Sequence, residues 1–393
     1  MQKITENILW TGIKDWDLRH FHGQELSTQR GTTYNAYIIL DKKNVLVDTV
    51  WPPHALPFMD EIRAFGVENI DAIIINHMEP DHGGTLGMIM DIKPDIPIYC
   101  TQKGKEIITS YFRKDWNFVT VKTGDTLDIG ENTLTFVEMK MIHWPDSMMV
   151  YADKEKVLFS NDAFGQHYCT KSLFNDEVDN HELYQEAIKY YANILTPFAS
   201  LIKSKVLEIN KLGLDVKIIA PSHGVLWREN PFQIVEKYLE WSDSYQEDFV
   251  VVIYDTMYQS TKKMAEGIEK GLRGKGVLVK LYNAAVTDPS YLLTEIFKSK
   301  GMAVGSCTVN NGAMASIHTL VHEIRSHKFK DKPFLAFGSH GWSGEAARDI
   351  HEGLLAAKLS PVANPVTAKY NPGEDVLEAC EKAGAMLADI LKI

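Results

Sequence analysis

The sequence has few of the features that mark membrane, secreted or nucleic-acid-binding proteins. No run approaches the ~18 consecutive apolar residues of a transmembrane helix, and residues 1–6 lack the apolar core of a signal peptide. Only 4 of the 393 residues are cysteine, and none forms a CxxC pair. Lysine and arginine number 41 against 52 aspartate and glutamate, and this net charge of −11 disfavours phosphate contacts. We expect a cytoplasmic protein with reduced thiols that binds neither membranes nor nucleic acid.

The composition, 45% hydrophobic and 24% charged, is that of a globular protein. Its length of 393 residues exceeds one ordinary domain of about 100–200 residues. The acidic segment 240–248 is the candidate linker between two domains, residues 1–248 and 249–393.

Both domains are expected to be α/β, but strands and helices alternate differently in the two. In the first, β-rich segments alternate irregularly with helical ones, and a helical region over 181–212 is interrupted at Pro197. In the second, apolar strands and amphipathic helices alternate strictly, beginning with the strand 249–255. That alternation predicts a doubly wound parallel sheet.

The strongest local signal is the segment His77-Met-Glu79-Pro-Asp81-His82, which follows the apolar run 71–75. It holds two histidines and two carboxylates at the carboxyl end of a predicted strand. A loop of this kind can point alternate side chains at two metal ions about 3–4 Å apart. The segment therefore indicates a binuclear metal site.

Three more candidate ligands stand in similar settings. His143 ends the predicted strand 134–142, and Asp162 and His223 follow the predicted strands 156–159 and 216–220. Alone, each is more simply interpreted as a polar loop or turn residue. Combined with the segment 77–82, they complete a set of imidazoles and carboxylates without thiolates. Such a set disfavours a structural zinc ribbon and suits iron or manganese, with zinc still open.

The order of these motifs resembles the metallo-β-lactamase fold, whose hydrolases usually carry HxHxDH where this sequence has HxExDH. The chain is similar to the flavodiiron proteins in having Glu79 at that place. It also resembles them around the other three ligands, where it has His-Trp-Pro-Asp-Ser, Asn-Asp-Ala-Phe-Gly and Pro-Ser-His-Gly. The resemblance implies an oxo- or hydroxo-bridged pair of irons. One iron would be held by His77, Glu79 and His143, the other by Asp81, His82 and His223, with Asp162 as the bridging carboxylate.

Loops rich in hydroxyl groups and glycine follow three predicted strands of the second domain, at the edge where open α/β sheets bind ligands. The first loop opens a helix, so it is either an anion cradle or an ordinary helix cap. Because no Walker A motif or GxGxxG follows that strand, a mononucleotide is favoured over a dinucleotide. Length and loop order are similar to flavodoxin, which implies FMN. The candidate FMN residues are Thr256, Met257, Tyr258, Gln259, Ser260, Thr261, Ser306, Thr308, Val309, Asn310, Asn311, Gly312, Ser339, His340, Gly341, Trp342, Ser343 and Gly344.

The flavodiiron resemblance covers the whole chain and implies an oxidoreductase. An external donor would reduce FMN, and FMN would pass electrons to the irons, where dioxygen yields water or nitric oxide yields nitrous oxide and water. Because the sequence shows no rubredoxin-like pair of CxxC motifs, the expected donor is a separate rubredoxin or a reduced deazaflavin coenzyme. The family further implies a head-to-tail homodimer, or a homotetramer, and a role in detoxification.

Weaker candidates for the pocket around the irons are His22, Phe164, Tyr190 and Tyr191, each of which has an equally simple structural interpretation. His167 is a candidate to support the ligands from behind. Two other functions are weighed against the oxidoreductase. One is a dizinc hydrolase with an appended flavodoxin module, which Glu79 in place of histidine disfavours. The other is an electron carrier whose first domain is only a scaffold.

Overall fold

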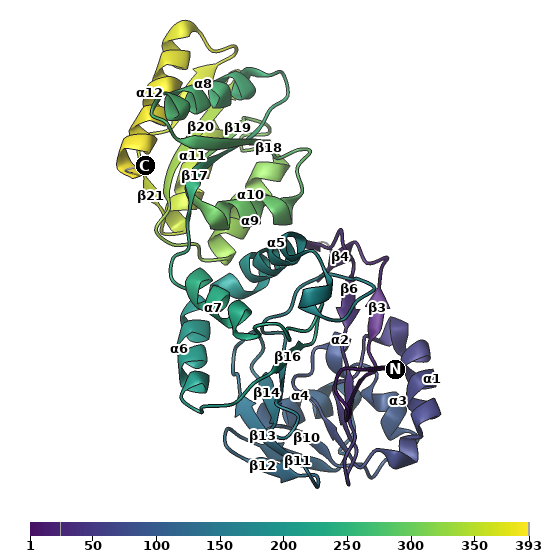
Figure 1. Ribbon diagram of the computed structural model, residues 1–393. Coiled ribbons are helices and arrows are strands. Elements are labelled where there is room, and N and C mark those ends of the chain that lie inside the picture. Colours follow the sequence, from purple (N-terminus) through teal and green to yellow (C-terminus); the bar gives the residue numbers. More distant parts are fainter. Residues whose placement is uncertain (24, 392–393) are drawn as a thin grey trace. The chain divides into compact units, whose positions relative to one another are not determined.

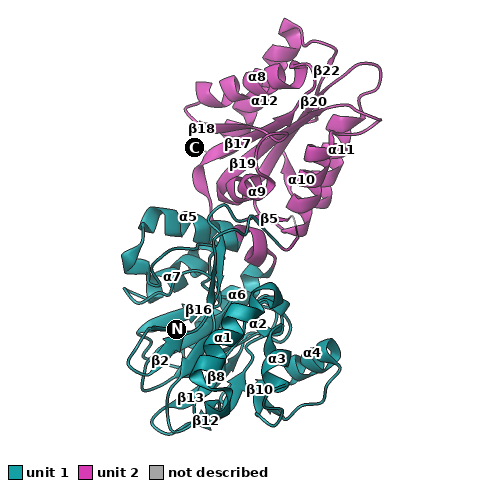
Figure 2. Cartoon of the chain, turned by 90° about the vertical axis from the view of Figure 1, so that its right-hand side faces the viewer, with its two compact units in different colours: residues 1–21, 28–191, 198–242 teal, residues 22–27, 192–197, 243–393 magenta. Residues whose placement is uncertain are grey.

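The computed structural model describes residues 1–23 and 25–391, and the chain forms two compact units (Figure 1). Unit 1 comprises residues 1–21, 28–191 and 198–242. Unit 2 comprises residues 22–27, 192–197 and 243–393 (Figure 2). Among the described helices, none combines the length and the apolar character needed to cross a bilayer.

Unit 1 is built on two sheets. The seven-stranded sheet has the order β1 (Gln2–Lys3), β2 (Ile8–Trp10), β7 (Tyr37–Ile39), β8 (Val45–Val47), β9 (Ala72–Ile74), β10 (Ile98–Thr101) and β11 (Phe118–Val121). The five-stranded sheet has the order β12 (Thr126–Asp128), β13 (Thr133–Glu138), β14 (Met148–Ala152), β15 (Val157–Asn161) and β16 (Ile218–Pro221). Two short strands, β3 (Ile13–Asp15) and β6 (Thr32–Tyr34), pair with each other.

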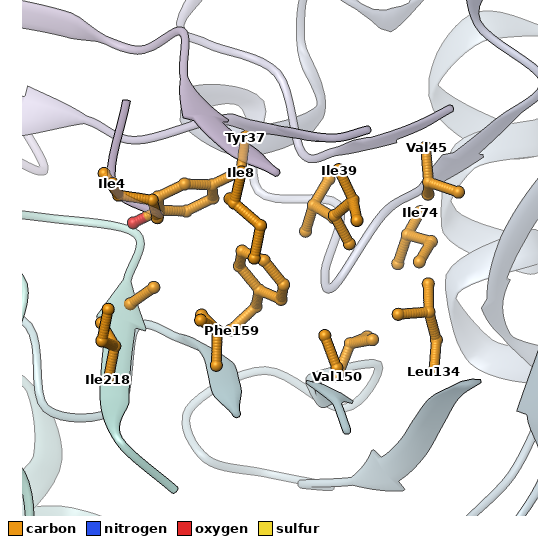
Figure 3. Close-up of a cluster of buried hydrophobic side chains, with 14 of the residues drawn as sticks. Ile4, Ile8, Tyr37, Ile39, Val45, Ile74, Leu134, Val150, Phe159 and Ile218 are labelled. Carbon is orange, nitrogen blue, oxygen red and sulfur yellow. The ribbon is translucent and has the colours of Figure 1, made fainter. Parts of the chain in front are cut away.

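The two sheets enclose one hydrophobic core, because every second side chain of a strand points to the same face. Ile39 and Ile74 from the seven-stranded sheet lie opposite Leu134, Val150 and Phe159 from the five-stranded sheet (Figure 3). All five side chains are buried. This shared core holds the sheets together, so the strand ends that carry the candidate ligands belong to one rigid body.

Helices cover the outer faces of both sheets. On the seven-stranded sheet lie α1 (Ala55–Phe65), α3 (Leu86–Met90) and α4 (Gln102–Phe112), whose buried side chains include Phe58, Ile62, Ile89 and Ile108. On the five-stranded sheet lie α6 (Ala199–Asn210) and α7 (Phe232–Trp241). The helix α5 (Asn180–Tyr190) precedes them. These layers form an αββα sandwich, which confirms the metallo-β-lactamase-like fold.

Unit 2 is a parallel sheet covered by helices. Its order is β18 (Leu278–Asn283), β17 (Glu247–Asp255), β19 (Ser299–Cys307), β20 (Pro333–His340) and β21 (Ser360–Pro361), and β22 (Val366–Lys369) also pairs with β20. The helices α8 (Ser260–Gly274) and α12 (Glu374–Leu391) pack on one face. The helices α9 (Pro289–Lys298), α10 (Ala315–Ser326) and α11 (Glu345–Ala356) lie on the other (Figure 2). This is the flavodoxin-like order, and the predicted doubly wound sheet is confirmed.

The structure corrects two local expectations. The strand β13 ends at Glu138, so His143 lies in the turn before β14 and not at a strand end. The helical region 181–212 breaks from Tyr191 onward, through a π turn and a 3-10 turn (Thr196–Phe198), so the interruption includes Pro197 but starts before it.

Candidate metal centre and flavin site

Buried carboxylates hold the backbone of segment 77–82, which leaves β9 and enters the short helix α2 (Pro80–Gly83). Asp48 accepts hydrogen bonds from Asn76 N at 2.7 Å and from Asn76 Nδ2 at 2.8 Å. Asp146 accepts one from Met78 N at 2.8 Å. The protein itself therefore sets the direction of the imidazole and carboxylate groups in this segment.

The first group of candidate ligands brings together His77, Glu79, His143 and Asp162. Nε2 of His77 lies 3.3 Å from Glu79 Oε2 and 3.4 Å from Asp162 Oδ2. Nε2 of His143 lies 2.9 Å from the same Asp162 oxygen and 3.4 Å from Glu79 Oε2. Two imidazole nitrogens and two carboxylates thus converge on one point, as they do around a bound cation.

The second group brings together Asp81, His82 and His223. Oδ2 of Asp81 lies 3.4 Å from Nε2 of His82 and 3.2 Å from Nε2 of His223. The other oxygen of Asp162, Oδ1, lies 3.0 Å from Nε2 of His82 and 3.6 Å from Nε2 of His223. Asp162 therefore turns one oxygen to each group, which is the geometry of a carboxylate that bridges two ions.

The rear nitrogens of two of these histidines are held by the protein. Nδ1 of His223 donates to Thr33 O at 2.7 Å. Nδ1 of His77 lies 2.8 Å from the Asn161 side-chain amide. Contacts of this kind orient a metal-binding imidazole and leave Nε2 facing the ion. Sequence reasoning missed Thr33 and Asn161, since neither residue type marks a metal site by itself.

Several buried polar atoms of the two groups lack hydrogen-bond partners and could instead bind a cation. Within the described part of the chain, Asp81 Oδ1 and Oδ2, His82 Nδ1 and Nε2, and Asp162 Oδ1 have no hydrogen-bond partner of acceptable geometry. These three residues are at most 5% exposed. Leaving buried polar atoms unsatisfied costs about 1–3 kcal/mol each. Two metal ions would satisfy all the atoms that face the centre, so the donor set fits a binuclear site.

The titration of the metal-free centre follows from this crowding. Burial alone lowers the pKa of His82, but Asp81 and Asp162 outweigh it and raise that pKa to about 10. Asp162 and Glu79 outweigh burial in the same way and raise the pKa of His143 to about 10. In return, the histidines hold the pKa of Asp162 well below its usual range although burial acts to raise it. Protons thus occupy the centre at neutral pH where metal cations would otherwise sit, and metal binding releases them.

The pocket candidates have different surroundings. Tyr190 is buried, its ring lies 6.3 Å from that of His223, and burial together with the nearby carboxylates raises its pKa well above the usual value. His167 packs at 5.1 Å against both Tyr190 and His223 and bonds Thr32 Oγ1 at 2.8 Å. These contacts place both residues beside the second group of ligands.

The other three pocket candidates lie apart from this contact set. Phe164 is buried in the turn after Asp162 and packs against Tyr238 at 4.8 Å. Tyr191 packs against Tyr238 at 5.1 Å and belongs to the aromatic core around α7. His22 is exposed and belongs to unit 2, whereas both ligand groups belong to unit 1.

Unit 2 contains a cavity of about 490 Å³ at the carboxyl ends of its central strands. The cavity lies between the loops after β17, β19 and β20, the position where the strand order reverses and where flavodoxin-like sheets bind FMN. Trp342 and Tyr258 border it with 90% and 87% of their surface exposed, which leaves two aromatic faces for a flat ring system. The Thr256 hydroxyl, buried at the start of the first loop, has no partner among the described residues. A polar ligand at the amino end of α8 would satisfy it.

Twelve of the candidate FMN residues line this cavity: Thr256, Met257, Tyr258, Ser260, Thr308, Asn310, Asn311, Ser339, His340, Gly341, Trp342 and Ser343. The others shape the loops behind it. Thr261 bonds Ser339 Oγ at 2.9 Å, Ser306 accepts from Met314 N, and Val309 and Gly312 bond each other across the second loop. Gln259 and Gly344 stand at the amino ends of α8 and α11. Two further residues line the cavity: Cys307, which lies in the second loop, and Tyr370, which no sequence motif marks.

Comparison with known proteins places both units in one family. Residues 32–224 match the family model "ODP family beta lactamase", and residues 252–384 match "Flavodoxin". Over 390 residues the chain is 48% identical to the anaerobic nitric oxide reductase flavorubredoxin of Klebsiella pneumoniae, which covers 98% of this chain and 81% of that protein. A flavorubredoxin of the same name from Escherichia coli is equally similar, at 48% over 390 residues.

Solved structures agree with these matches. The rubredoxin oxygen:oxidoreductase from the anaerobe Desulfovibrio gigas superposes with a TM-score of 0.96 at 34% identity, covering 100% of this chain and 98% of that one. The flavodiiron protein from Giardia intestinalis superposes with a TM-score of 0.93 at 32% identity, covering 100% and 96%. With an αββα unit that gathers two sets of metal ligands, a flavodoxin-like unit and relatives of this similarity, the chain belongs to the flavodiiron protein family.

Proposed function

We propose that the protein reduces dioxygen, nitric oxide or both at a non-haem diiron site, with electrons that pass through FMN from an external donor. The observation that carries this proposal is Asp162, whose two oxygens face two separate groups of nitrogen and oxygen ligands. When bound, the iron pair supplies the redox chemistry and FMN supplies the electrons. Dioxygen takes up four electrons and four protons to give two waters. Two nitric oxide molecules take up two electrons and two protons to give nitrous oxide and one water.

We assign His77, Glu79 and His143 to one iron, Asp81, His82 and His223 to the other, and Asp162 to both. The distances between the ligand atoms and the orphaned atoms of the second group support this assignment. The chain's own contribution is to aim these atoms, since Nδ1 of His223 is fixed on Thr33 O. It also restricts water, since five of the seven ligand side chains are buried and those of Glu79 and His143 are only 12% and 11% exposed.

The cavity of unit 2 is the proposed FMN site. Different parts of its lining would bind different parts of FMN. The hydroxyl groups of Thr256 and Ser260 at the amino end of α8 would bind the phosphate. The aromatic rings of Trp342, Tyr258 and Tyr370 would pack against the ring system. The remaining candidate FMN residues hold these groups in place through the contacts described above. We propose Tyr190, whose ring lies beside that of His223, as a residue that shapes the gas-binding side of the metal centre.

The donor, the assembly and the setting belong to the same proposal. We propose rubredoxin or a reduced deazaflavin coenzyme as the electron donor, a head-to-tail homodimer or a homotetramer as the assembly, and the cytoplasm as the location. The four cysteines are free and buried, which is compatible with a reducing compartment. We propose residues 1–248 and 249–393 as the domains that carry iron and FMN. Limited proteolysis followed by cofactor analysis of the fragments tests these boundaries.

A dizinc hydrolase with an appended flavodoxin module is disfavoured. The relatives from Klebsiella pneumoniae and Escherichia coli are named as nitric oxide reductases, and the structural neighbour from Desulfovibrio gigas is named as an oxygen oxidoreductase. Glu79 also occupies, within hydrogen-bonding distance of His77, the place where those hydrolases carry a histidine.

The decisive experiment is anaerobic reduction of the iron- and FMN-loaded protein, followed by separate pulses of dioxygen and nitric oxide monitored by gas electrodes. We expect consumption of at least one gas with simultaneous reoxidation of FMN. His82→Ala should abolish consumption, whereas His318→Ala, on the exposed face of α10, should leave it unchanged. The proposal fails if the wild-type protein keeps both cofactors and consumes neither gas.

A further inference from the structure

An apolar cavity of about 140 Å³ lies between the five-stranded sheet and the helices α6 and α7 of unit 1. Leu158, Phe164 and Ile219 form its inner wall, and Val206 and Ile209 of α6 form its outer wall. Asn210, at its mouth, is the one polar side chain among the described residues that line it. Neither the metal centre nor the FMN site accounts for this cavity.

The size and the chemistry of the cavity restrict what it can hold. A buried water needs two to four polar partners, and apolar cavities of about 150 Å³ stay dry and bind xenon or benzene. The inner wall of this cavity offers only hydrocarbon groups. It therefore suits a small uncharged molecule and excludes ions and strongly hydrated solutes.

The inner wall is part of the turn that carries the bridging carboxylate. Phe164 follows Asp162 by two residues, so their Cα atoms lie within about 7 Å of each other. Its backbone is fixed on both sides: Phe164 N donates to the Tyr238 hydroxyl at 2.9 Å, and Phe164 O accepts from Trp227 Nε1 at 2.9 Å. The backbone of Phe164 is thus fixed, and its side chain lines the cavity two residues after the bridging carboxylate.

The opposite end of the cavity reaches the surface. Phe232 at the start of α7 is 40% exposed, and Gly213 in the loop after α6 is exposed. By contrast, Leu158, Phe164 and Ile219 are each at most 5% exposed. The lining therefore runs from solvent to Phe164, in the turn that follows Asp162, without meeting a charged side chain among the described residues.

We propose that this cavity takes up dissolved dioxygen or nitric oxide and delivers it past Phe164 to the diiron site. The proposal rests on the proposed function, because it assigns a path to the gas that this function consumes. Both gases are uncharged diatomic molecules and partition into apolar surroundings, whereas the carboxylate-rich centre itself is polar. The cavity would raise the local gas concentration beside the site.

The first test uses xenon as a probe of the holoprotein, in crystals pressurised with the gas. We expect xenon density between Phe164 and Val206 in the wild-type protein. Ile209→Trp should remove that density by filling the outer part of the cavity. Leu207→Trp is the matched control, since Leu207 lies on the same helix but is 48% exposed and does not line the cavity. Absence of xenon from the wild-type cavity would overturn the proposal, whatever the activity.

The second test measures delivery. Ile209→Trp should lower kcat/KM for the gas about threefold or more while kcat at saturating gas stays the same, and Leu207→Trp should change neither. Xenon should also raise the KM for the gas in the wild-type protein, a measurement that does not depend on any variant folding. If Ile209→Trp excludes xenon but kcat/KM stays at the wild-type value, gas reaches the irons by another path and the proposal is wrong. Loss of both gas-consuming activities in the wild type would instead refute the proposed function, because the xenon density is read without turnover.

Discussion

Replacing Asp162 with asparagine should weaken iron binding at the metal centre more than any other single substitution of similar size. The carboxylate lies within 3.6 Å of the Nε2 atoms of four histidines, with one oxygen turned to each ligand group. An asparagine side chain of the same shape has a single oxygen, so one group would face an NH₂ that cannot bind a cation. We expect Asp162→Asn to retain at most one iron tightly.

The size of the loss follows from the number of contacts. Removing only the hydrogen-bond partner behind a metal ligand lowers metal affinity about 10- to 100-fold. Asp162 touches both groups directly, so we expect at least that loss for the ion left without an oxygen, about 1.4–2.8 kcal/mol. Gas reduction needs both irons and should fall with the second one.

The assay is the iron content per FMN after dialysis against a weak chelator, together with the rate of gas consumption. Asp15→Asn is the matched control, because Asp15 is also a buried carboxylate, paired with His54 at 2.8 Å, but belongs to neither ligand group. The control should keep both irons. If Asp162→Asn also holds two irons after dialysis and turns over at the wild-type rate, the bridging role of this residue is refuted.

Three further predictions concern pH, flavin binding and loop geometry. In the metal-free chain the pKa values of His82 and His143 are raised to about 10. The two protonated imidazoles therefore stabilise the folded chain fully below about pH 6.5, and this stabilisation is lost as the pH rises to about 10. The Tm of the metal-free protein should fall over that range, and iron loading should remove the decline. Trp342→Ala should weaken FMN binding about tenfold, which corresponds roughly to the stacking energy of one aromatic face. Trp16→Ala, at an exposed site outside the cavity, should leave FMN binding unchanged. A flavin fluorescence titration measures both dissociation constants. Gly224→Ala should lower the iron content without unfolding unit 2. The backbone at Gly224 has a φ of +77°, and an added Cβ would lie 2.4 Å from the backbone oxygen of Gln166, in the loop after β15. An unchanged iron content would contradict this prediction.

The ligands of the metal centre could be predicted from the sequence because several of them are local. His77, Glu79, Asp81 and His82 fall within one segment after an apolar strand, and that signal needs no knowledge of the fold. The two-sheet fold of unit 1 was implied only by the resemblance of its motifs to the metallo-β-lactamase fold. The parallel sheet of unit 2 was predictable from the strict alternation of apolar strands and amphipathic helices. That alternation and the segment 77–82 depend on periodicity and spacing, which the sequence displays directly.

Other features depend on long-range packing and left no local signal. His143 was expected at a strand end, but β13 stops pairing at Glu138 and a turn carries the ligand. Tyr370 reaches the flavin cavity because β22 pairs with β20, a contact between distant segments that no motif marks. The helix α7 was missed, since its buried face of Val235, Tyr238 and Trp241 has only the helical spacing of any amphipathic segment.

The parallel pairing of β15 with β16, and of β8 with β9, also decides where the chain can gain or lose residues. The side chains of His77, Asp162 and His223 leave from the carboxyl ends of these strands. One residue inserted after a strand would move a ligand by about 3.3 Å, as much as the whole distance between neighbouring ligand atoms. Insertions at the opposite edge, in the turns 41–44 and 153–156, would leave every ligand where it is. Length variation among related chains and tolerance to engineered insertions should therefore concentrate on that edge.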